Sequence, residues 1–115
     1  MFYRYEVPKL NQGIFGAIED ILDLNNEEEL DLLFKIVAYF EDNLKAPNID
    51  MKDTESWFTE KGNRKFKKSI KKIIMVLEER NYSVSRIQKE LNENKILYKD
   101  EYQVIISRKS STTSL

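Results

Sequence analysis

A chain of 115 residues with a formal net charge of −1 has room for one domain with a single modest core, which excludes a multidomain protein. Its 41% hydrophobic and 34% charged residues exclude an intrinsically disordered chain. Cysteine and histidine are both absent, and this excludes disulfides, thiol nucleophiles, the usual structural zinc sites and a histidine general base.

The N-terminal segment predicts a strand followed by a short helix. Residues 2–7, FYRYEV, are aromatic and β-prone, and Pro8 ends this first strand. Apolar residues then recur at helical spacing over residues 14–24, with acidic residues on the other side. The expected apolar face of this helix consists of Ile14, Ala17, Ile18, Ile21 and Leu22.

A second acidic helix is expected over residues 26–44, with Asn26 as its N-cap and Glu29 placed to complete a capping box. Its expected apolar face consists of Leu33, Phe34, Val37, Phe40 and Leu44, widened by Ile36 and Tyr39. Pro47 stops this helix. The loop that follows carries three acidic residues but lacks the glycine and distal glutamate of a calcium loop, so no metal site is expected.

The segment from Trp57 to Leu77 predicts a buried entry strand or turn, at Trp57 and Phe58, and then a long helix capped by Thr59. Gly62 should weaken its first turn by up to about 1 kcal/mol. The expected core face of the helix consists of Phe66, Ile70, Ile73, Ile74 and Leu77. The opposite, cationic face consists of Arg64, Lys67, Lys68, Lys71 and Lys72.

The C-terminal part of the chain predicts mainly β structure. Residues 82–91 fit either a helix or a polar edge strand, and the strand is favoured. Residues 95–107 are typical of a strand, or of a hairpin that turns at Lys99 and Asp100. The sequence therefore predicts a single α+β domain over residues 1–107, in which a small, mostly antiparallel sheet packs against two or three amphipathic helices. Residues 108–115 are expected to form a flexible polar tail.

Charge is divided unequally along the chain. Residues 1–60 contain 5 Lys and Arg against 14 Asp and Glu, a balance of −9, and residues 61–115 contain 14 against 6, a balance of +8. Either the two halves neutralise each other in the fold, or a charged face stays exposed for a partner. The basic helix face could bind phosphates, although lysine dominates it and interleaved aromatic residues are absent. A winged helix, with SVSRIQKEL as its reading helix, is a further alternative, but it has one helix too few.

Four short segments carry a resemblance: YRYEV near the start, GIF after it, ESWFTEKG at mid-chain and ILYKDEYQVII near the end. Together they resemble a group of small uncharacterised proteins of low-GC Gram-positive bacteria and their phages. That group implies no function for this chain.

The order of elements also resembles an ADP-ribosyltransferase core, which implies roles for Arg4 on the first strand, Ser56 ahead of a helix and a catalytic Glu101. The chain is short for such a fold, and Gln103 stands where a second acid often lies. The alternative is that Arg4 and Glu101 simply pair across neighbouring strands.

Taken together, these features lead us to expect a non-enzymatic binding module, of the kind that a phage or mobile element would use to inhibit or regulate a host defence system through charged faces. The alternatives are an ADP-ribosyltransferase-like enzyme or nucleotide binder, and a winged-helix DNA-binding regulator. We expect a protein partner and no cofactor, with nucleic acid as the alternative partner of the basic helix and homo-oligomerisation left open. Without a signal-peptide pattern or an apolar stretch of membrane-spanning length, we expect a cytoplasmic protein with no membrane partner.

Overall fold

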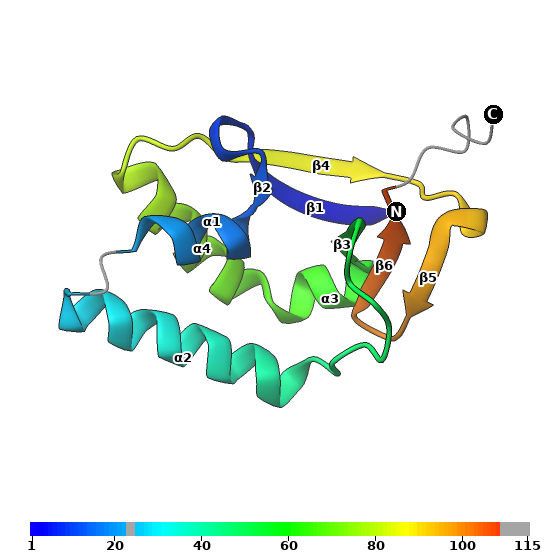
Figure 1. Cartoon of the computed structure of the whole chain (residues 1–115), viewed down its shortest axis with the longest axis horizontal. Coiled ribbons are helices and arrows are strands. Elements are labelled where there is room, and N and C mark those ends of the chain that lie inside the picture. Colours follow the sequence, from blue (N-terminus) through cyan, green and yellow to red (C-terminus); the bar gives the residue numbers. More distant parts are fainter. Residues whose placement is uncertain (23–24, 109–115) are drawn as a thin grey trace.

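The computed structural model describes residues 1–22 and 25–108, and it places a strongly twisted sheet over a layer of helices (Figure 1). The helices are α1 (Ile14–Ile21), α2 (Glu27–Asn43), α3 (Glu60–Lys65) and α4 (Lys67–Glu79), with two short 3-10 turns, η1 (Pro8–Leu10) and η2 (Glu93–Lys95). The strands are β1 (Phe2–Val7), β2 (Gln12–Gly13), β3 (Thr54–Phe58), β4 (Ser85–Lys89), β5 (Ile96–Lys99) and β6 (Gln103–Ser107). The predicted α+β class, with a mostly antiparallel sheet, is confirmed.

The sheet is organised around β1, and each strand pair in it is antiparallel. Along one edge β1 pairs with the whole of β4, from Phe2 opposite Lys89 to Glu6 opposite Ser85. Along the other edge β1 pairs with β3 only where Tyr3 lies opposite Phe58. At the C-terminal end of β1, Glu6 and Val7 pair with β2. The strands β1 and β3 therefore separate beyond Tyr3, and this gap positions the cavity described below.

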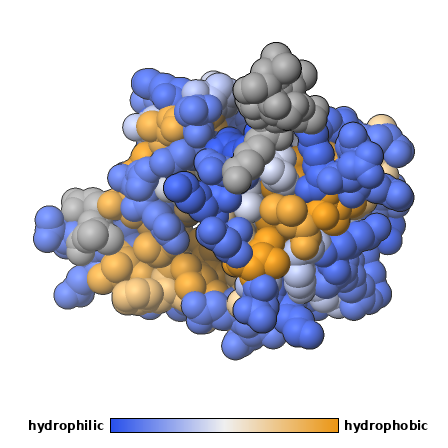
Figure 2. Space-filling view, turned by 45° about the vertical axis from the view of Figure 1, so that its right-hand side comes forward, coloured by the Kyte–Doolittle hydropathy of each residue, from blue (hydrophilic) through white to orange (hydrophobic). Residues whose placement is uncertain are grey.

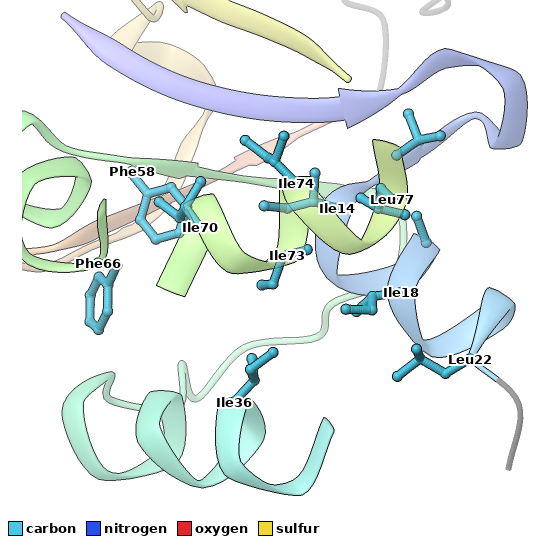
Figure 3. Packing of buried hydrophobic residues seen from close by; sticks show 12 residues of the cluster. Ile14, Ile18, Leu22, Ile36, Phe58, Phe66, Ile70, Ile73, Ile74 and Leu77 are labelled. Carbon is cyan, nitrogen blue, oxygen red and sulfur yellow. The ribbon is translucent and has the colours of Figure 1, made fainter. Parts of the chain in front are cut away.

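The main core lies between the sheet and the helices. Strand alternation sends Tyr3, Tyr5 and Val7 of β1 to the helix side, where Phe58 of β3 joins them. The predicted core face of the basic helix is confirmed, because Phe66, Ile70, Ile73, Ile74 and Leu77 are all buried against α1 and the sheet (Figure 3). On the other face of the sheet, Trp57, Val104 and Ile106 form a smaller cluster.

The single helix expected from Thr59 onward is instead two helices, because the chain bends at Phe66, whose φ of −98° and ψ of 10° are not helical. The predicted N-cap is confirmed, since the Thr59 hydroxyl accepts a hydrogen bond from the Gly62 backbone N–H at 3.0 Å. Gly62 is the reason that α3 can lie against the β5–β6 turn. A Cβ at this position would lie 2.0 Å from the carbonyl oxygen of Tyr102, so the glycine permits a close approach.

The helix α2 packs less completely than its sequence predicts. Its N-cap is confirmed, because the Asn26 side chain accepts hydrogen bonds from the backbone N–H groups of Glu28 and Glu29. Ile36 is its one buried residue within the described chain. The prediction that Phe34 faces the core is wrong: its side chain is 62% exposed, because the inward stripe runs through Leu32, Ile36 and Phe40 and Phe34 lies on the opposite side of the helix.

The C-terminal expectations are largely confirmed. Within residues 82–91 the chain forms the strand β4, and β5 and β6 form a hairpin whose turn follows Lys99. The helix that a winged-helix motif would need at SVSRIQKEL is therefore absent from this described segment, and that interpretation is wrong. The polar tail lies outside the described residues from 109 onward, as do residues 23 and 24 of the first predicted helix. In the described ranges, no helix is both long and apolar enough to cross a membrane.

Candidate functional site

The cationic face of α4 forms a crest between two grooves. Because Lys67 and Lys71 are four residues apart, they point to one side of the helix, and Lys68 and Lys72 point to the other. All four side chains are exposed, while the opposite side of the same helix is buried. The sequence therefore folds into a helix whose apolar face fixes the direction in which its cations project.

The first groove runs between α4 and the edge of the sheet formed by β1 and β4, and it has a volume of about 320 Å³. Its cations are Arg64, Lys67, Lys71 and Arg86. The Tyr5 hydroxyl at its base donates a hydrogen bond of 2.5 Å to the Asn63 side-chain oxygen. Burial raises the pKa of Tyr5, against the opposing charge of Arg86, so this phenol stays neutral and does not weaken the positive potential.

The second groove runs between α4 and α2, with a volume of about 380 Å³. Its apolar lining consists of Leu32, Ile36 and Tyr39, all from α2. Its cations are Lys35 from α2 and, from the other side, Lys65, Lys68 and Lys72. This groove thus combines an apolar surface with lysines along its α4 side, whereas Lys35 on the α2 side forms an ion pair with Asp31, with 3.0 Å between Nζ and Oδ2.

The lysines of the crest lack carboxylate neighbours. In residues 1–22 and 25–108, no ion pair joins Arg64 or any of the four α4 lysines to an acidic group. The ion pairs that join the acidic and basic halves of this part of the chain lie elsewhere, between Arg80 and Glu29 and between Arg108 and Glu55. The fold therefore keeps the basic surface largely separate from the acids of the first half.

A smaller cavity of about 210 Å³ opens where β1 and β3 separate. Phe15 of α1, Phe40 of α2 and Phe58 of β3 line it, and their rings contact one another, with 4.7 Å between the centroids of Phe15 and Phe40. Arg4, Ser56 and Gln103 supply its polar lining. The cavity therefore combines aromatic walls with a few polar groups, a composition common in small-molecule sites.

Two of the three residues suggested by the transferase-like order, Arg4 and Ser56, meet at this cavity. The Arg4 guanidinium bridges the gap between the strands, with Nη1 donating to the Ser56 carbonyl oxygen at 2.8 Å and Nε donating to Glu6 Oε1 at 2.7 Å. Glu101 does not line the cavity and instead forms an ion pair with Lys61. The alternative of an Arg4–Glu101 pair is wrong as well, because β3 lies between β1 and β6.

Gln103 occupies the place in the cavity that the transferase-like order would give to an acid. Its side-chain N–H donates to the Lys45 carbonyl oxygen at 2.7 Å, and the residue is only 8% exposed. The carboxylates nearest to the Arg4 guanidinium, those of Glu6 and Glu55, are held in contacts with arginines or with Trp57. Among the described residues, no carboxylate lines this cavity.

Three cations of the grooves were not singled out from the sequence: Lys65 at the end of α3, and the more distant Lys35 and Arg86. Each of these last two belongs to an element far along the chain from the basic helix, and only the tertiary fold brings it alongside. In the described chain, no cluster of three or more acidic side chains is arranged to hold a metal ion. Comparisons of the whole chain with protein-family models, with curated proteins and with solved structures gave no match.

Proposed function

We propose that this protein is a non-enzymatic binding module that recognises an acidic surface of another protein through the basic crest of α4. The observation that carries this proposal is the absence of carboxylate partners for Arg64 and the four α4 lysines in the described chain. Like charges held close together repel one another, and an acidic partner would relieve this repulsion. Inhibition of a host defence system by a phage or mobile-element protein, the more specific role, would use this same surface.

A protein partner is favoured over nucleic acid by the surroundings of the crest. Proteins that hold single strands stack bases on exposed aromatic rings, and the exposed face of α4 carries lysines without such rings. Apolar lining, as supplied by Leu32 and Tyr39, is used by protein partners rather than by phosphates.

Fluorescence anisotropy with labelled probes tests this proposal. The probes are an acidic peptide and a DNA duplex, measured at a physiological ionic strength of about 0.15 M. The protein should bind the peptide more tightly than the duplex, and Lys68→Glu with Lys72→Glu should weaken peptide binding about tenfold or more. The matched control is Lys45→Glu with Lys52→Glu, in the loop between α2 and β3, which makes the same change in net charge. Tighter binding of the duplex, with a steep loss on adding salt, would contradict the protein-partner proposal.

Nucleotide binding is the second candidate function, and the cavity that joins Arg4 and Ser56 favours it. Its aromatic lining would accept a nucleobase-sized ring, with the Arg4 guanidinium beside it. Calorimetry with NAD should then detect heat that Arg4→Ala abolishes, and no turnover is expected because Gln103 stands in place of an acid. An absence of heat at millimolar NAD would remove this candidate.

A further inference from the structure

We infer that the groove between α2 and α4 is the docking site for an acidic amphipathic helix of the partner protein. This inference rests on the proposed function and narrows it from a charged surface to one groove and one kind of ligand. Three features carry it: the incomplete burial of α2, the spacing of the side chains along the groove, and the charge of its rims.

The first feature is that the fold leaves apolar side chains of α2 partly exposed. It has 17 residues, yet Ile36 is the one that the fold buries, reaching toward the side chains of α4 (Figure 3). Tyr39 remains 39% exposed, and Leu32 is only partly buried. Figure 2 shows a broad apolar area at the height of α2, bordered by hydrophilic side chains. A helix placed in the groove would cover the exposed parts of Leu32 and Tyr39, which line it.

The second feature is the helical spacing of the α2 wall. On α2 the lining residues Leu32, Ile36 and Tyr39 follow one another at intervals of four and three residues. On the opposite wall Lys68 and Lys72 lie one turn apart on α4, and Lys65 lies at the end of α3, before the break at Phe66. The α2 row spans about 10 Å, or two turns of helix. A partner helix with apolar residues at positions i, i+3, i+4 and i+7 would match the α2 row and pack as a third helix.

The third feature is that the charge lies at the rims and not at the floor. Lys68 and Lys72 border the groove, and neither forms an ion pair within the described part of the chain. The Nζ of Lys65 lies 5.0 Å from the centre of the Tyr102 ring. Glutamates flanking the apolar stripe of a partner helix would therefore meet lysines, while the stripe itself meets Leu32 and Ile36.

The groove can be blocked without removing any packing, because Ser69 lines it and has a small side chain. Ser69→Trp should fill the groove, and Ser69→Ala should leave it open. The probe is a synthetic helix of about 20 residues, with leucines at the spacing given above and glutamates on both sides. The matched control peptide has the same composition but a scrambled order. Thermal unfolding of both variants shows whether each is folded.

We expect wild type and Ser69→Ala to bind the amphipathic peptide at least about tenfold more tightly than the scrambled one, and Ser69→Trp to lose this preference. If both peptides bind equally well and the Lys68→Glu and Lys72→Glu pair weakens both, the inference of helix docking in the groove is overturned, but the proposed function still stands. Absence of binding by either peptide would overturn both. A dimer of the free protein that Ser69→Trp dissociates would assign the groove to a second copy of this chain and overturn the inference.

Disulfide trapping gives an independent test that does not depend on the tryptophan variant folding. Because the chain has no cysteine, Ser69→Cys introduces a single thiol inside the groove. A peptide whose one cysteine, in its apolar stripe, is activated as a mixed disulfide with 5-thio-2-nitrobenzoate should then exchange with this thiol and release the nitrothiobenzoate faster than it does with Ser83→Cys, whose side chain is exposed before β4. Equal rates for the two variants would place the peptide elsewhere and contradict the inference.

Discussion

The backbone of Gly62 in α3 lies so close to Tyr102 that a Cβ on Gly62 would stand 2.0 Å from the Tyr102 carbonyl oxygen. The same carbonyl accepts a hydrogen bond from the Thr59 backbone N–H at 3.0 Å, so it cannot move away without breaking that bond. Gly62→Ala should therefore destabilise the fold by about 1 to 3 kcal/mol, although alanine is the better helix former. Urea denaturation of the variant measures this loss.

Gly16 in α1 provides the control for that substitution. A Cβ there would approach only the flexible side chain of Gln12, at 3.3 Å, which is able to shift. Gly16→Ala should consequently leave the free energy of unfolding unchanged or raise it by up to about 1 kcal/mol. Similar losses for both glycines would mean that the contact between α3 and Tyr102 is not as close as the structure has it.

The two faces of α4 should differ sharply in their contribution to stability. Ile73 is fully buried, so Ile73→Ala should cost about 2 to 5 kcal/mol through lost burial and the cavity left behind. Lys68 is exposed on the opposite face, and Lys68→Ala should change the free energy of unfolding by less than about 0.5 kcal/mol. Denaturant titrations of the two variants compare these losses directly, and equal small losses would show that the core face has been assigned wrongly.

Asp100 should make the β5–β6 turn sensitive to acid. Burial acts to raise the pKa of its carboxyl, but hydrogen bonds from Tyr98, Tyr102 and Gln103 outweigh it and hold the pKa below the ordinary 3.8. A carboxyl whose pKa is lowered on folding stabilises the protein above its unfolded pKa, and this stabilisation is lost as the pH falls through the folded value. Asp100→Asn should therefore unfold at a lower temperature than wild type at neutral pH.

The pH dependence of that difference is the test of its cause. The gap in melting temperature should stay constant above pH about 5 and narrow below the ordinary aspartate pKa of 3.8, where the wild-type carboxyl also becomes protonated. A gap that is unchanged down to pH about 2 would instead mean that the carboxylate charge does not stabilise the turn.

Local patterns along the chain were sufficient to predict most of the elements and the main core. The aromatic, β-prone run before Pro8 located β1, and the caps at Asn26 and Thr59 located the starts of α2 and α3. The break at Phe66 could not be predicted, because it depends on contact of α3 with the β5–β6 turn, whose residues lie about forty positions later in the chain.

The candidate surfaces were predictable only in part. Helical spacing predicted that Lys68 and Lys72 would share the exposed side of a helix, but it could not show that α2 would lie alongside them. That arrangement depends on the ion pair of Arg80 with Glu29 and on the burial of Ile36, both of which join distant segments. For the same reason, no pattern along the chain indicated that Glu101 would pair with Lys61 or that Arg4 would contact Ser56.

A charge-swap experiment tests most directly the claim that the basic crest of α4 recognises an acidic protein surface. The dissociation constants of an acidic peptide and of its lysine-for-glutamate counterpart are measured against wild type and against Lys68→Glu with Lys72→Glu. Wild type should bind the acidic peptide. The charge-reversed protein should bind the acidic peptide about tenfold or more less tightly, and it should bind the basic peptide, which wild type does not. Unchanged binding of the acidic peptide to the charge-reversed protein, or an equal loss in the Lys45→Glu and Lys52→Glu control, would contradict the account.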